Sequence, residues 1–294
     1  MFSEKVSIIM RTKDVSNIID QTLKALFSQS FKNFDLIIVD SDSSDDTLEK
    51  CLKYEHKLMV FTSSDYHPGK VLNSAINKCT TNVVVFLNSD CVMLLPNSLQ
   101  ILLNELEEEK TSAVFARQIC RPEALSWVQR DYDVSFPNNT NPSWMHFSLP
   151  LAAIRKSVWK QIPFYTQAWA SEDTKWAVDI KSQGHIVKYV KNSLVMHSHN
   201  YDFQQMSNRK YVEGEADAFI YNKKITLIRT LRNYIGSVYN DLIFHTKKLD
   251  FSGFFKSLVL RAVLHYSYLK GNIFGMKRKE SNDLKQTYGN YQQG

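Results

Sequence analysis

The chain has 294 residues, of which 44% are hydrophobic and 22% charged, an ordinary globular composition with enough apolar residues for a full core. Its formal charge of +6 is uneven. Residues 203–294 carry 15 Lys/Arg against 7 Asp/Glu, a net of +8, which leaves −2 on residues 1–202. The basic last third favours contact with an anionic partner; the alternative is a solvated basic helical face.

The sequence lacks the segments that are typical of membrane-spanning and secreted proteins. It has no apolar stretch of 18 residues, so no ordinary transmembrane helix is expected. The first apolar run, residues 6–10, is too short for a signal peptide. The four cysteines show neither a C-x-x-C pair nor zinc spacing, which indicates reduced thiols in a cytoplasmic protein.

The first 120 residues alternate between short apolar runs and stretches of helical periodicity. Strands are predicted at residues 6–10, 34–40, 58–61, 82–87 and 113–116, and helices near residues 19–27, 44–53, 71–79 and 99–106. This order predicts an α/β fold with a mostly parallel central sheet flanked by helices. Ligands of such sheets bind at the carboxyl ends of strands, where the acids Asp40, Asp42, Asp65 and Asp90 follow.

The second half is less regular. Residues 121–150 are rich in turn signals, and helices are predicted at 152–162 and at 172–183, where Gly184 ends the second. Strands are predicted at 185–190 and 193–199, and mainly helix follows residue 203. The chain therefore divides into a predicted catalytic domain, residues 1–202, and a helical C-terminal region, residues 203–294.

Three blocks of sequence, in order, carry a resemblance to a known family. They are "VSIIMRTKD" with "FDLIIVDSDSSDDT", then "HPGKVLNSAINKCTTNVVVFLNSDC", then "ASEDTKWAVDIKSQGHIVKYVKNSLVMHSHNY". Over roughly residues 5–202 they resemble inverting family 2 glycosyltransferases of the GT-A fold. The resemblance is closest to bacterial rhamnosyltransferases and similar O-antigen or capsule enzymes.

The resemblance assigns a nucleotide-sugar donor to the ends of the first strands. It implies that Asp40 and Asp45 lie near the nucleotide, although Asp45 can also serve only as a helix cap. The remaining donor-binding assignments are Arg11, Thr12, Lys70, Asn88 and Ser89. Lys70 is either a cation for the donor or a solvated residue at a helix start.

Asp90 matches the last acid of the family's D-x-D metal motif, in which Asn88 replaces the first acid. The resemblance implies a divalent ion, Mn²⁺ or Mg²⁺, on the donor diphosphate. It also implies a histidine ligand, His197, although His199 lies on the same face of the predicted strand. The alternative for Asp90 is a capped turn after a buried strand.

The acidic pair Glu172-Asp173 matches the family's acceptor-side acids. Inversion by a single displacement needs one base for the acceptor hydroxyl, and the resemblance assigns Asp173 as base with Glu172 in support. Both acids also suit the first turn of a helix. Trp144 and Trp169 are predicted to contact the acceptor sugar, or else to be core residues.

The predicted function is transfer of a sugar, dTDP-L-rhamnose being the donor that the resemblance favours, to a saccharide or polyprenyl-linked acceptor in cell-surface polysaccharide synthesis. The alternatives are a nucleotidyltransferase that makes a nucleotide-sugar and a non-catalytic nucleotide- or sugar-binding module. No nucleic-acid partner is expected. The expected location is the cytoplasm, with peripheral contact to the inner face of the plasma membrane through the basic C-terminal region, whose other roles are packing or an oligomer interface.

Overall fold

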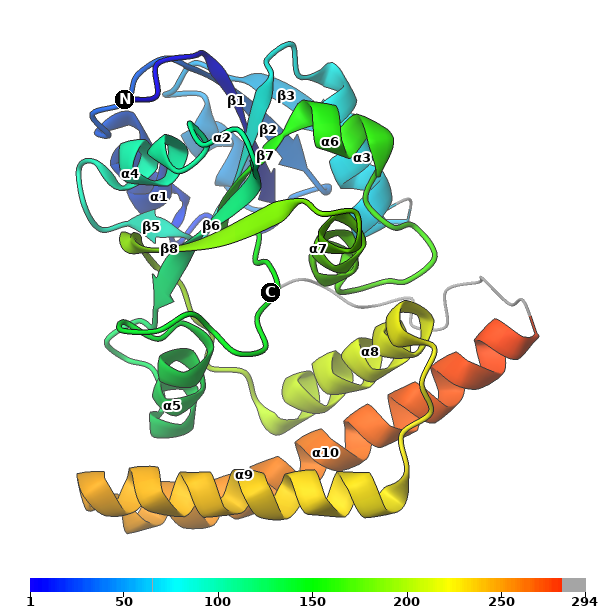
Figure 1. Cartoon of the computed structure of the whole chain (residues 1–294). Coiled ribbons are helices and arrows are strands. Elements are labelled where there is room, and N and C mark those ends of the chain that lie inside the picture. The colour runs from blue at the N-terminus through cyan, green and yellow to red at the C-terminus, as the bar shows by residue number, and fades with distance from the viewer. Residues whose placement is uncertain (65, 282–294) are drawn as a thin grey trace.

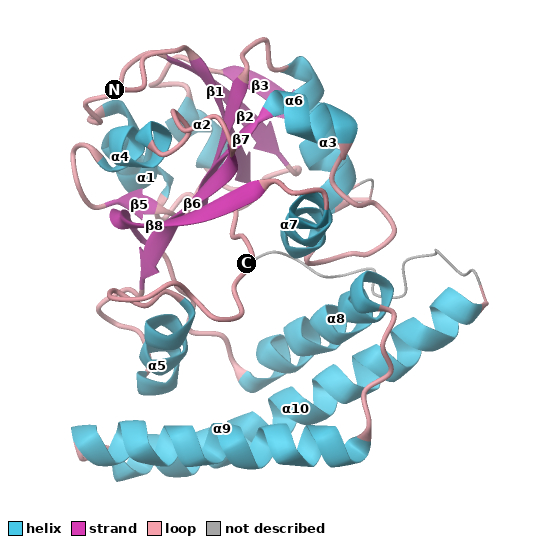
Figure 2. Ribbon diagram, viewed as in Figure 1, coloured by secondary structure: helices cyan, strands magenta, loops and turns pink. Residues whose placement is uncertain are grey.

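The computed structural model describes residues 1–64 and 66–281, so Asp65 and the last residues of the predicted C-terminal region lie outside the described part. Its core is one eight-stranded sheet in the order β3-β2-β1-β4-β7-β6-β8-β5 (Figure 1, Figure 2). The strands are β1 Val6–Thr12, β2 Phe34–Asp40, β3 Lys57–Val60, β4 Val83–Asn88, β5 Val92–Met93, β6 Thr111–Ile119, β7 Leu151–Arg155 and β8 Ile186–Met196. The predicted α/β class and mostly parallel sheet are confirmed.

Alternating side chains of the central strands pack against helices on opposite faces of the sheet. In β1, Ile8 and Met10 belong to one buried cluster and Ile9 to the other, as the period of two requires. The helices α1 Ile19–Phe27, α2 Thr47–Cys51 and α4 Ser98–Asn104 cover the first face, and α3 Pro68–Lys78, α6 Lys156–Gln161 and α7 Glu172–Ser182 cover the second. Apolar residues at every position of a strand are therefore needed, and this explains the near-continuous apolar runs.

The carboxyl ends of five strands meet at one edge of the sheet. β1, β2 and β4 pair in parallel, and β6 pairs in parallel with β8. β7 lies between β4 and β6 and is antiparallel to both, so β6 runs in the same direction as β4. The residues that follow β1, β2, β4, β6 and β8 are consequently brought together at this edge.

Two predictions for the second half are wrong in detail. Residues 152–155 were expected to be helical but form β7, because burial between two strands overrides the helix propensity of its alanines. The two strands predicted at 185–190 and 193–199 are one strand, β8, with a bulge where the pairing shifts from Val190 to Leu194. The short β5 and the helix α5 Ser126–Ser135 were not predicted.

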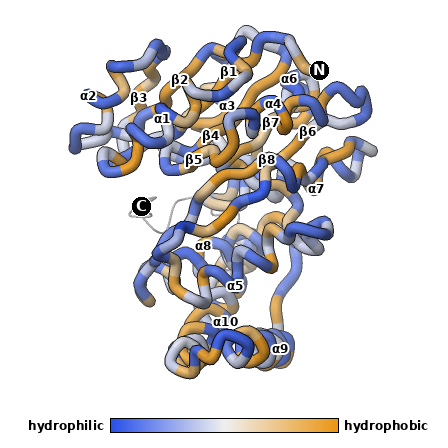
Figure 3. The backbone as a smooth tube through the Cα atoms, turned by 90° about the vertical axis from the view of Figure 1, so that its left-hand side faces the viewer, coloured by the Kyte–Doolittle hydropathy of each residue, from blue (hydrophilic) through white to orange (hydrophobic). Residues whose placement is uncertain are grey.

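The mainly helical C-terminal region is confirmed, as α8 Phe203–Tyr221, α9 Leu227–Lys248 and α10 Phe251–Glu280. α10 packs closely on α8, and a Cβ on Gly271 would lie 1.9 Å from the backbone oxygen of Tyr211. Only glycine fits at such an approach. α9 and α10 lie at the end of the molecule that is farthest from β1 and β3 (Figure 1, Figure 3). Within the described residues, no helix is long and apolar enough to cross a membrane.

Candidate active site

A cavity of about 810 Å³ opens at the edge of the sheet where the parallel strands end. Its walls come from the loops after β1, β2, β4, β6 and β8, from α5, from the start of α7 and from α8. Nine of the residues predicted from the sequence line it: Arg11, Thr12, Asn88, Ser89, Asp90, Trp169, Glu172, Asp173 and His197. Residues that are far apart in the chain thus share one site.

Asp90, His197 and His199 form a cluster of potential metal ligands. One donor atom from each lies within 4.8 Å of the others. His199 Nε2 is 3.0 Å and His197 Nε2 is 3.5 Å from Asp90 Oδ2. Asp90 lies in the turn after β4 and the two histidines directly follow β8, so the strand order sets this geometry.

Hydrogen bonds on the side of the His197 ring that faces away from Asp90 fix its orientation. Its Nδ1 lies 2.9 Å from Gln118 Oε1 and 3.3 Å from the Tyr132 hydroxyl. Gln118 donates its amide N–H to Ser148, which assigns the amide oxygen to the histidine. Because an amide oxygen can only accept, Nδ1 carries the proton and the Nε2 lone pair points toward Asp90.

The charge states of this cluster suit a cation. Burial lowers the pKa of His197 to about 4, so its imidazole is neutral at neutral pH. Burial also acts to raise the pKa of Asp90, but at low pH, where His197 is protonated, the charge of His197 and the hydrogen bond from His199 outweigh burial and hold the pKa below its ordinary value. A lone pair and a carboxylate oxygen 3.5 Å apart repel one another unless a positive charge lies between them. One carboxylate and two imidazoles therefore fit a divalent transition-metal ion such as Mn²⁺.

The Glu172-Asp173 pair forms the first turn of α7 on another wall of the same cavity. Ser171, just before it, has φ +59°, a left-handed conformation that is uncommon for serine and that sets the direction in which the helix starts. Glu172 is buried and lies 3.4 Å from the Arg11 guanidinium. Its charge is thereby balanced, and Asp173 has no comparable ion pair among the described residues.

Asp173 has a raised affinity for a proton. Burial and the neighbouring Glu172 charge raise its pKa from 3.8 to about 7. The Thr174 backbone N–H and the Arg11 charge oppose this rise only in part. A half-buried carboxyl with a pKa near neutrality is suited to accept a proton and to release it again.

The cavity wall also holds cations and aromatic rings that the sequence reasoning did not assign. Arg121 donates to the Asp90 backbone oxygen at 2.7 Å, which places its guanidinium beside the histidine cluster. Arg209 of α8 lies over the Tyr201 ring at 4.6 Å, and Tyr201 stacks on His199 with ring centroids 4.9 Å apart. Two guanidinium groups near the metal-ligand cluster make this corner suitable for an anion.

Four of the predicted residues do not line the cavity. The buried Asp40 accepts hydrogen bonds from Ser43, and Asp45 accepts from the backbone of Ser16, so both order loops next to it. Lys70 is exposed at the start of α3, and Trp144 is 52% exposed. Their assignments to donor and acceptor stay predictions.

The unassigned residues had weak signals in the sequence. Gln118 belongs to β6, whose last residues extend beyond the predicted strand, and Arg121 follows it. Tyr132 lies in the unpredicted α5, where Val128, Tyr132 and Phe136 have the spacing of one helix face. Extending the fifth strand and testing that spacing would have found Gln118 and Tyr132.

The sequence matches the family model described as glycosyl transferase family 2 over residues 7–163, more than half of the chain. The chain belongs to glycosyl transferase family 2. This match covers the first two of the blocks named above, and it confirms the family resemblance and, at the level of the family, the prediction of a transferase enzyme.

Curated relatives include the O-antigen chain rhamnosyltransferase WbaN of Salmonella anatum, 27% identical over 61% of this chain and 61% of that protein. Another is the O-antigen chain rhamnosyltransferase RfbN of Salmonella typhimurium, 24% identical over 71% of each chain. The alignment with the first relative thus spans less than two thirds of its length.

Solved structures support the fold. The mannosyltransferase PcManGT from Pyrobaculum calidifontis, in complex with GDP-Man and Mn²⁺, superimposes with a TM-score of 0.68 at 13% identity, over 93% of this chain and 88% of that one. S. aureus TarS 1–349 in complex with UDP gives a TM-score of 0.55 at 16% identity, over 95% and 92%. The predicted glycosyltransferase fold with a helical C-terminal region is therefore confirmed.

Proposed function

We propose that the protein transfers a sugar from a nucleotide-sugar to a hydroxyl of a saccharide or lipid-linked saccharide, with inversion at the anomeric carbon. One observation carries this proposal: a metal-ligand cluster and a half-buried acid with a pKa near 7 line the same cavity. A diphosphate leaving group needs the first, and a displaced hydroxyl proton needs the second.

The donor diphosphate is assigned to the corner formed by Asp90, His197 and His199. A divalent ion held there would neutralise the charge that develops on the departing diphosphate. Arg121 and Arg209 reach the same corner and are assigned to phosphate oxygens, for which a guanidinium fork is well matched. Asn88 and Ser89 line the cavity just before Asp90 and are placed to contact the donor.

Asp173 is proposed as the base that takes the proton of the acceptor hydroxyl. Its carboxylate attracts that proton as the oxygen attacks the anomeric carbon, and one such displacement inverts the configuration. Glu172, paired with Arg11, keeps the pKa of Asp173 high and does not compete for the role. Trp169 also lines the cavity and offers a flat face for the acceptor sugar.

The choice of dTDP-L-rhamnose as donor rests on the two O-antigen rhamnosyltransferases among the relatives. A relative from Escherichia coli, 25% identical over 37% of this chain, is named as a glucosyltransferase acting on a diphosphoundecaprenol-linked sugar. It supports a lipid-linked acceptor for a family member of this kind, in the synthesis of a cell-surface polysaccharide.

The test is release of nucleoside diphosphate from a panel of nucleotide-sugars, with Mn²⁺, with Mg²⁺ and with EDTA. Turnover of one donor that depends on added metal supports the proposal. Pyrophosphate formation would indicate a nucleotidyltransferase, and donor binding without turnover would indicate a binding module. The anomeric configuration of the product, determined by NMR, tests inversion separately.

A further inference from the structure

The helices α9 and α10 form a hairpin whose outer surface exposes many large apolar side chains, and we call this surface the hairpin face. On α9 its large apolar residues are Leu227, Ile228, Leu231, Ile235, Tyr239 and Leu242, and on α10 they are Phe251, Phe255, Val259 and Tyr266. Ile228 is 82% and Phe255 66% exposed. Apart from the neighbours Leu227 and Ile228, each set follows steps of three, four or seven residues, so each forms one stripe along its helix.

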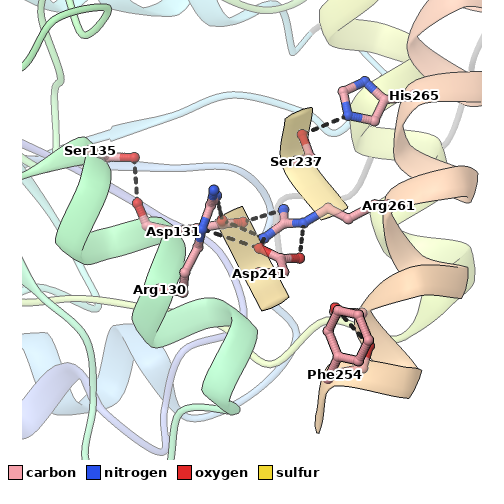
Figure 4. Close-up of polar contacts among 9 residues, drawn as sticks. Arg130, Asp131, Ser135, Ser237, Asp241, Phe254, Arg261 and His265 are labelled. Carbon is pink, nitrogen blue, oxygen red and sulfur yellow. Dashed lines mark hydrogen bonds and ion pairs between the residues drawn. The ribbon is translucent and has the colours of Figure 1, made fainter. Parts of the chain in front are cut away.

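α9 contributes little to the protein core. Asp241 and His245 are the buried residues of this 22-residue helix. Both lie on the side that faces α5 and α10, where Arg261 donates to Asp241 at 2.7 Å and Arg130 pairs with it (Figure 4). The two buried residues of α9 are thus polar, while many of its large apolar side chains are exposed, which is not the pattern of a helix that covers a core.

The charges on the hairpin face have one sign. Between residues 223 and 279 the only acids are Asp241 and Asp250, and both are held by neighbouring side chains. The exposed cations of the two helices include Arg229, Arg232, Lys247, Lys256 and Lys270. Within residues 1–64 and 66–281, none of these five forms an ion pair with a carboxylate.

The combination of apolar stripes and cations without an acidic partner favours an anionic membrane surface as the partner. Two copies of the chain joined about a two-fold axis would bring the same cations against one another, at an electrostatic cost. An anionic bilayer surface instead accepts the stripe among its acyl chains and neutralises Lys and Arg at its headgroups. Tyr239 and Tyr266 suit the boundary between these two layers.

We propose that the hairpin face docks the protein on the surface of a membrane that contains anionic phospholipid. The docking is peripheral: the helices lie in the plane of the interface and do not cross it. This proposal rests on the C-terminal helices alone and does not depend on the reaction catalysed in the cavity.

The test is co-sedimentation of the full chain with vesicles of phosphatidylcholine, with and without phosphatidylglycerol, at low and at high NaCl. Binding is expected only with the anionic lipid and is expected to weaken with salt. Replacing Arg229 and Arg232 by Gln should lower the partition coefficient by about tenfold or more, because each cation near such a surface contributes a factor of about five. Replacing Ile228, Leu231 and Ile235 by Gln should lower it further.

The control removes an exposed leucine elsewhere: Leu52→Gln, at a residue 76% exposed at the end of α2, should bind vesicles as the wild type does. Circular dichroism should show unchanged helix content in all variants. Equal binding to neutral and anionic vesicles, or hairpin variants that bind as the wild type does, would overturn the proposal. A dimer in light scattering that the hairpin variants dissociate would also refute it, in favour of a second copy as partner.

Discussion

The pKa of Asp173 provides the sharpest test of the proposed chemistry. The value of about 7, against an ordinary 3.8, means that the folded protein disfavours this carboxylate by about 4 kcal/mol. If Asp173 is the base, kcat/KM at saturating Mn²⁺ should fall tenfold for each pH unit below about 7. At pH 5 only about one hundredth of the activity should remain.

Glu172 supplies part of this rise, after burial, and the Glu172→Gln variant isolates its share. The substitution removes a negative charge and also releases Arg11 from its ion pair, and both changes favour the Asp173 carboxylate. The acidic limb of the pH profile should therefore move down by about one pH unit. A limb that stays in place, or a flat wild-type profile between pH 5 and pH 8, would refute the assignment of Asp173 as base.

The same shift predicts a change in stability of known sign. The folded state binds the Asp173 proton more tightly than the unfolded state, so this group lowers the free energy of unfolding as pH rises from about 4 to about 7. Asp173→Asn cannot ionise and should be more stable than the wild type at pH 8, while turnover falls by about a thousandfold. Thermal unfolding at pH 4 and pH 8 measures this, and equal stability at pH 8 would contradict the burial of the charge. Donor affinity should be nearly unchanged in this variant.

Four further predictions concern the metal-ligand cluster, the acceptor and the C-terminal helices. Asp90→Asn should abolish calorimetric Mn²⁺ binding, because it removes the only carboxylate of the cluster. Gln118→Leu should weaken Mn²⁺ binding by about 10- to 100-fold, since His197 loses the partner that fixes its tautomer. Trp169→Ala should raise the acceptor KM, whereas the exposed Trp144 should matter less. Arg261→Met should lower the free energy of unfolding by about 3–5 kcal/mol in urea, because it leaves Asp241 buried without one of its two partners.

Each of these has a clear contrary outcome. Unchanged Mn²⁺ affinity in Asp90→Asn would place the metal elsewhere, and a Gln118→Leu variant with wild-type affinity would show that His197 needs no support. Similar effects of the two tryptophan substitutions would extend the acceptor site beyond the cavity. Fully retained stability in Arg261→Met would show that Arg130 alone neutralises Asp241.

The first half of the fold could be predicted because its local signals agree with its tertiary structure. β2 was predicted with its observed bounds, since the apolar run 36–39 suits a strand buried on both faces. β7 was not, because alanine favours a helix and only pairing with β4 and β6 makes it a strand. The residues of β7 and their sequence neighbours do not show with which distant strands β7 will pair.

The residues of the candidate site also divide into those that local sequence predicts and those that only the tertiary structure places. Asp90 and His197 follow strands and could be found from strand ends, whereas Arg209 reaches the cavity from α8. Its contribution depends on how the C-terminal helices fold back on the sheet, which no spacing in the sequence reveals. Asp40 shows the opposite case, a strand-end acid whose carboxylate is used by its own loop.

The ion pairs of Arg261 have a consequence for the order in which the site is completed. Arg261 binds both oxygens of Asp131 on α5, at 2.7 and 2.9 Å (Figure 4). Asp131 and its neighbour Tyr132 both line the cavity. During synthesis α5 leaves the ribosome about 130 residues before this partner. The wall that carries Tyr132, the neighbour of His197, therefore gains this ion pair only when α10 has emerged, so a shorter nascent chain lacks this support for the cavity.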